Sequence, residues 1–101
     1  MAFSVRIEGI SKETGRVVLT IKPRWWNADE LRADDRFKDI STFLGYEDLE
    51  AHLWFEDMRV LHEKYKERAM SSEQTKVQEL ETALYTSVDT YSFFHVTVSE
   101  W

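Results

Sequence analysis

The sequence predicts an α+β domain, with a small antiparallel sheet of about three strands and helices packed on one face of it. Apolar and polar residues alternate near both ends of the chain, which is the period of a β-strand. In the middle of the chain, apolar residues recur every three or four positions, as on one face of a helix. The length of 101 residues suits one domain, so residues 1–101 are expected to form a single unit.

The N-terminal part is predicted to be a β-hairpin. Its first strand alternates apolar and polar side chains over residues 3–8, and its second strand does so over residues 17–22. The connecting residues 11–15 include Gly15, which can adopt the positive φ of a tight turn. Pro23 ends the second strand because it has no N–H to donate to the ladder.

Helical patterns begin after Asn27. With Glu30 three residues later, Asn27 resembles a capping box, and the helix that follows either continues or breaks near residues 34–35. The apolar spacing over residues 37–44 is that of one helix face, and Gly45 is typical of the position after a helix end.

The longest helical pattern covers residues 46–68, where two apolar stripes predict a central helix buried over a wide arc. Trp54 belongs to one of these stripes, together with Met58 and Leu61. A third helix is predicted after a serine cap at residues 71–72. The predicted element order is therefore β-β-α-α-α-β.

The last strand is predicted within residues 90–100, with Phe94, Val96 and Val98 facing the helices. The alternate residues then face the other way, and helices on one side leave that second face open. An aromatic, mixed-charge open face is a candidate binding surface, unless a loop or Trp101 covers it. The residues expected there are Tyr91, Phe93, His95, Thr97, Arg6, Glu8, Val18, Thr20 and Lys22.

No catalytic motif is present, and neither a cofactor nor a metal is expected. The chain has no cysteine and three separate glycines, and it lacks a phosphate-binding loop, a nucleophile elbow and a dinucleotide fingerprint. His52 and Glu56 have the spacing of one helical turn, but no zinc-protease motif surrounds them. We therefore expect a protein that is not an enzyme.

Negative charge is concentrated in one stretch. The chain has a net charge of −6, and residues 29–57 hold ten acids and three bases, a net −7. Direct binding of nucleic acid is not expected, because phosphate contacts need a basic surface. The stretch is either solvated helix surface or a negative field that steers a basic partner. The acids expected to contact such a partner are Asp34, Asp35, Asp39, Glu47, Asp48, Glu50, Glu56 and Asp57.

Aromatic residues are the second element of a predicted contact surface. Trp25 and Trp26 follow Lys22-Pro23-Arg24, so they cap the core where strand meets helix, anchor a protein contact, or stack on single-stranded bases. Phe93, on the predicted open face, is a third candidate anchor.

In size, acidity and lack of cysteine, the whole chain resembles the immunity proteins of bacterial toxin–immunity systems, including contact-dependent growth inhibition. The resemblance implies a cytoplasmic domain that neutralises a cognate toxin, often a basic nuclease, by occluding its active site or substrate surface. It implies no particular residue, and it leaves monomer and homodimer open.

Two other functions fit the same composition. One is a phage- or plasmid-encoded acidic inhibitor or nucleic-acid mimic, and the other is a small ligand-binding or enzymatic domain. No membrane partner is expected, because the N-terminal residues are too charged for a signal peptide and no apolar run is long enough to span a bilayer.

Overall fold

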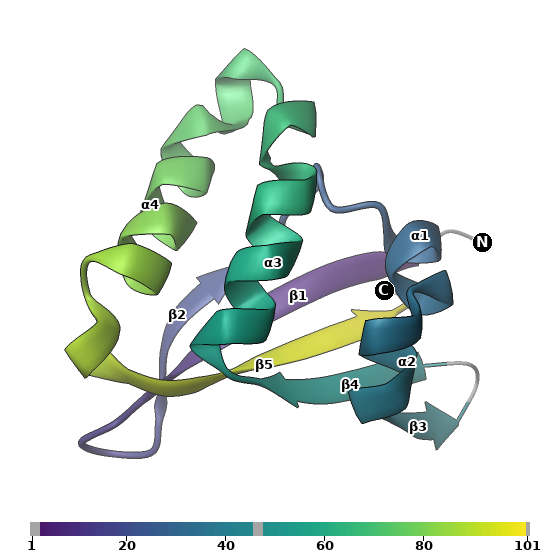
Figure 1. The fold of residues 1–101 in the computed structure, drawn as a ribbon, viewed down its shortest axis with the longest axis horizontal. Helices are drawn as coiled ribbons and strands as arrows, with labels where there is room; N and C mark the ends of the chain where they lie inside the picture. The colour runs from purple at the N-terminus through teal and green to yellow at the C-terminus, as the bar shows by residue number, and fades with distance from the viewer. Residues whose placement is uncertain (1–2, 46–47, 101) are drawn as a thin grey trace.

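Five strands form one antiparallel sheet in the computed structural model, which describes residues 3–45 and 48–100 (Figure 1). Their order across the sheet is β2-β1-β5-β4-β3. The predicted α+β class is confirmed, but the sheet has five strands instead of about three. The strands are β1 (Ser4–Ser11), β2 (Val17–Ile21), β3 (Ser41–Gly45), β4 (Asp48–Leu53) and β5 (Tyr91–Ser99).

The helices lie on one face of the sheet (Figure 1). They are α1 (Ala28–Ala33), α2 (Asp35–Ile40), α3 (Phe55–Tyr65) and α4 (Gln74–Tyr85). Three short 3₁₀ turns, η1 (Lys66–Arg68), η2 (Ser71–Glu73) and η3 (Val88–Thr90), lie in the connections around α4. Among the helices of the described residues, none has the length and hydropathy needed to cross a membrane.

Strand β5 lies at the centre of the sheet and pairs with β1 on one side and β4 on the other. Its pairing with β1 runs from Ser4 opposite Ser99 to Ser11 opposite Tyr91. The alternation that predicted these strands separates a buried face toward the helices from a less buried opposite face.

An irregularity in the β1–β5 pairing changes the predicted position of Tyr91. The register shifts between Ile10 and Ser11, so Tyr91 faces the helices, with its ring 5.2 Å from that of Phe94. Tyr91 therefore packs against the core, whereas the sequence analysis assigned it to the open face.

Residues 41–45 and 48–53 form two antiparallel strands, β3 and β4, where the sequence analysis predicts helix. Leu49 and Leu53, four residues apart, fit a helix face and a strand face equally well. The β4–β5 pairing decides between them, because it places Leu49 opposite Val98 and Leu53 opposite Phe94. The long helix predicted from residue 46 is therefore shorter and starts at Phe55, while Tyr46 itself lies outside the described residues.

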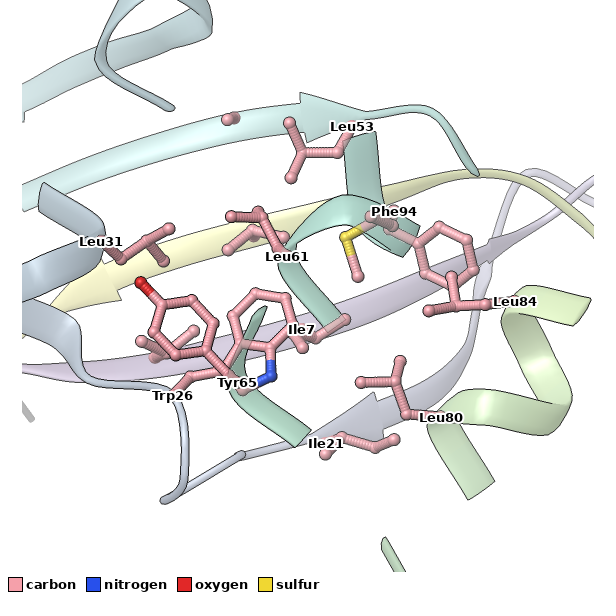
Figure 2. Packing of buried hydrophobic residues seen from close by; sticks show 14 of the residues in the cluster. Ile7, Ile21, Trp26, Leu31, Leu53, Leu61, Tyr65, Leu80, Leu84 and Phe94 are labelled. Carbon is pink, nitrogen blue, oxygen red and sulfur yellow. The ribbon is translucent and has the colours of Figure 1, made fainter. Parts of the chain in front are cut away.

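The core fills the space between the sheet and the helices. Figure 2 shows Leu61 of α3 and Leu80 and Leu84 of α4 above the strands that carry Ile7 and Phe94. Tyr65, at the end of α3, is fully buried, and its ring lies 5.5 Å from that of Trp26. Burial of these side chains fixes the helices on one face and leaves the other face of the sheet without a helix.

We expect Gly9→Ala to lower the free energy of unfolding by about 1–3 kcal/mol, the usual effect of overpacking. A Cβ at this position would lie 2.7 Å from Tyr91 Cε1 and 3.2 Å from Leu19 Cβ, so the tyrosine ring must move. Urea denaturation followed by tryptophan fluorescence measures the change. Thr20→Ala, at an exposed position of neighbouring β2, is the matched control. Equal stability of Gly9→Ala and the control would contradict this close packing.

Candidate functional site

The sheet face turned away from the helices carries titratable and aromatic side chains from three adjacent strands. Glu8 comes from β1, His95 and Phe93 from β5, and Glu50 and His52 from β4. The strand register brings them together, because His95 lies opposite both Glu8 and His52. These five residues are called the open-face cluster below.

His95 is held between two carboxylates. Its Nδ1 lies 3.0 Å from Glu8 Oε1, and its Nε2 lies 2.8 Å from Glu50 Oε2. All three side chains are about three-quarters buried. Each ring nitrogen of His95 therefore has one carboxylate oxygen within hydrogen-bonding distance. The arrangement links β1, β5 and β4 through their side chains.

A row of rings extends from His95 across the same face. His52 stacks on His95 at 5.0 Å between ring centroids, and Phe93 meets His52 edge-on at 5.3 Å. Trp54, directly after β4, lies 6.2 Å from Phe93 and is 63% exposed. The sequence analysis placed Trp54 in a buried helical stripe, but α3 begins one residue later and the ring lies outside the core.

The open-face cluster places charged and aromatic side chains next to one another. Both ring nitrogens of His95 contact carboxylate oxygens of the protein itself. The rings of Phe93 and Trp54 add apolar area next to these charges, which is the mixture found at protein interfaces.

Several of the acids predicted to contact a partner are neutralised within the molecule. Asp34 lies 3.1 Å from Lys64 Nζ, and Asp57 lies 3.3 Å from Arg36 Nη1. Glu50 belongs to the open-face cluster. Within residues 3–45 and 48–100, no base pairs with the remaining acids on this surface, which are Asp35, Asp39, Asp48 and Glu56. Glu47 lies outside the described residues.

Two predicted aromatic anchors are in the core. Trp25 is 4% exposed and Trp26 is 2% exposed, so neither ring offers area to a partner. They occupy the place where β2 leads into α1, which is the core role considered in the sequence analysis. Phe93, by contrast, lies half-buried on the open face as predicted.

The sequence analysis did not bring the members of the open-face cluster together. Alternation placed Glu8 and His95 on the open face, but the register that sets them opposite each other is a property of the folded sheet. Glu50 and His52 were assigned to a helix, so they had no place on the sheet. The alternation of Leu49, Ala51 and Leu53 with these two polar residues was the signal for β4.

A hydrogen-bonded junction holds α1 and α2 to the end of α3. Asp34 caps α2 by accepting the Phe37 N–H at 3.1 Å, and its second carboxylate oxygen accepts from Lys64. Arg68 contacts Glu30 on both carboxylate oxygens. Burial works to raise the pKa of Asp34, but the hydrogen bonds from Phe37 and Lys64 outweigh it, and the pKa lies below its ordinary value.

A histidine and two glutamates meet between α3 and α4. His62, Glu63 and Glu81 each offer one ligand atom, all within 4.8 Å of one another. Lys66 Nζ lies 2.7 Å from Glu63 and 4.0 Å from Glu81, so an ammonium group already supplies positive charge to these carboxylates. The fully buried His62 places its Nε2 3.2 Å from Glu81. This group forms an ion-pair network that connects the two helices.

Comparisons with known protein families, with curated proteins and with solved structures find no match. The function is therefore argued from the residues described above.

We expect a measurable coupling between Glu50 and His95 in a double-mutant cycle. Glu50→Gln, His95→Gln and the double variant should show a coupling free energy of about 0.5–1 kcal/mol, because the contact is short and partly buried. Urea denaturation at neutral pH provides the values. The control pairs Glu50→Gln with the exposed Thr20→Ala on distant β2, and additivity is expected there. Additive effects for Glu50 and His95 as well would contradict a contribution from this contact.

We expect Asp34→Ala to lower the free energy of unfolding by about 1 kcal/mol at neutral pH, as the loss of an N-cap does. The folded state lowers the pKa of Asp34 below 3.8, so the stabilisation from its charge is complete above that value. It is lost as the pH falls through the folded pKa, and the difference between wild type and variant should narrow in acid.

Chemical denaturation at neutral pH and at about pH 3 tests this dependence. Asp35→Ala, an exposed neighbour without an ion-pair partner among the described residues, is the control. A difference that stays constant or widens in acid would show that the charge of Asp34 does not stabilise the fold.

Proposed function

We propose that this protein is a protein-binding inhibitor of the immunity type, which neutralises a basic partner domain by covering its substrate surface. The observation that carries the proposal is Trp54, 63% exposed at the junction of β4 and α3 and next to Phe93 on the open face. Tryptophan is enriched among the residues that dominate binding energy at interfaces. Its exposed ring area is hydrated in the free protein, and burial by a partner is favourable.

The charges near Trp54 support a basic partner. Glu56 is exposed in the first turn of α3, and Asp35 and Asp39 are exposed on α2. Both helices contact β4, and the Arg36–Asp57 ion pair joins their N-terminal turns. These carboxylates therefore share one region of the molecule with Trp54. Such a field attracts lysine- and arginine-rich surfaces and raises the rate of association.

A nuclease-type toxin is the partner class that fits this chemistry. A nuclease holds phosphate with lysine and arginine side chains, and these are the groups that the carboxylates would pair with. The inhibitor would then occupy the surface that the substrate needs.

We expect Trp54→Ser to abolish capture of the partner, since it removes the anchor without changing a buried side chain. Tagged protein is used to capture partners from a lysate of the cells that encode it, and the bound proteins are identified by mass spectrometry. The wild type should retain one stoichiometric partner with a basic toxin or nuclease domain. Met70→Ser is the matched control, because Met70 is 69% exposed on the helix side, far along the chain from β4.

The purified partner is then mixed with the inhibitor in a stopped-flow instrument. Reversing the charge of Asp35 and Asp39 to lysine should slow association about tenfold at low salt and weaken its salt dependence. Capture of no partner, a partner without a basic surface, or equal capture by wild type and Trp54→Ser would overturn the proposal.

A further inference from the structure

A groove with cationic walls lies between the β2–α1 connection and the start of the helical run formed by η2 and α4. Lys22 and Arg24 line it from the connection, and Arg68 and Lys76 line it from the other side. Its volume is about 360 Å³. Four basic side chains around one groove are unexpected in a protein with a net charge of −6.

Three of the four cations are not neutralised by the protein. Arg68 pairs with Glu30, whereas Lys22, Arg24 and Lys76 have no carboxylate at ion-pair distance among the described residues. Glu73 also lines the groove and places one carboxylate near these cations, while it accepts the Met70 N–H at 2.8 Å. Three cations without an ion-pair partner outweigh the one carboxylate of Glu73, so this surface favours an anion.

Trp25 adds an aromatic side chain to the lining of the groove. It lines the groove, is 4% exposed, and its indole N–H has no hydrogen-bond acceptor within the described ranges. A buried donor without an acceptor is costly and rare in folded proteins. The N–H is itself inaccessible from the groove, so the case for an anion rests on the cations of the two walls.

We propose that this groove binds the phosphate groups of a small phosphorylated molecule. Its cations come from two separate parts of the chain, which suits an anion with several charges more than a single carboxylate. The volume is in the range of small-molecule sites. A long nucleic acid would extend beyond the groove over the acidic remainder of the surface, whereas a small polyphosphate contacts the groove alone.

The proposal gives a role to the Lys22-Pro23-Arg24-Trp25-Trp26 segment that the inhibitor function does not use. Burial of both tryptophans excludes base stacking on their faces in this conformation. Lys22 and Arg24 remain exposed at the groove. Pro23 lies between them and restricts the backbone there.

Titration of the ¹⁵N-labelled protein with inorganic tripolyphosphate at constant ionic strength tests the proposal. We expect saturable amide shifts centred on Lys22, Arg24, Ser72 and Lys76. Lys22→Ala combined with Arg24→Ala should raise the Kd at least about tenfold, and Lys76→Ala alone should weaken binding from the opposite wall. Lys12→Ala combined with Arg16→Ala, two exposed cations in the β1–β2 turn, changes the net charge equally and should leave the Kd within about twofold.

Three outcomes would overturn the proposal. The first is the absence of saturation at millimolar tripolyphosphate. The second is an equal loss of binding in the Lys12/Arg16 control, which would indicate a general charge effect. The third is tighter binding of a single-stranded oligonucleotide with the same number of phosphates, which would assign the groove to nucleic acid. None of these outcomes bears on capture of a partner through Trp54.

Discussion

The pairing of β5 with β1 and β4 is the interaction on which the rest of this structure depends. Strand β5 lies between the β1–β2 pair and the β3–β4 pair, and its Phe94, Val96 and Val98 are fully buried beneath the helices. The same pairing acts on the opposite face of the sheet, where it sets His95 between Glu8 and Glu50. One set of backbone hydrogen bonds thus determines both the core and the open-face cluster.

Local patterns in the sequence predicted the elements whose side chains have one clear period. The strands at both ends of the chain and the helix that contains Val77 and Leu80 were found in this way. Residues 41–53 were assigned to helices because the spacing of Leu49 and Leu53 fits the period of a helix as well as that of a strand. The strand is identified only by the pairing of these two residues with Val98 and Phe94. Local spacing carries no information about that contact, which is formed across the folded sheet.

The candidate site was less predictable than the fold for the same reason. Glu8 and His95 are 87 positions apart, and their contact depends on a register that no local pattern encodes. Trp54 was assigned to a helical stripe with Met58 and Leu61, but α3 begins one residue after it. Three residues after Ala51 it would continue a helical stripe, but directly after β4 it projects next to Phe93.

The distribution of charge on the folded protein differs from its distribution along the sequence. Two acids of the stretch at residues 29–57 are neutralised by bases from outside it. Lys64, at the end of α3, pairs with Asp34, and Arg68, in η1, pairs with Glu30. The field of the folded protein is therefore carried by the acids that these bases do not reach. Lys22, Arg24 and Lys76 lie elsewhere, so a net acidic chain also has a cationic groove.

The central position of β5 has a consequence for how the chain acquires its structure. Strand β1 forms most of its residue pairs with β5, and these paired residues are 80 or more positions apart in the sequence. Chains dominated by such distant contacts fold slowly. During synthesis, the hairpin of β1 and β2 leaves the ribosome long before β5, with the buried side chains of Val5 and Ile7 lacking their cover. Until β5 is synthesised, the edge of β1 that pairs with it also stays open, and an unpaired strand edge can associate with other chains.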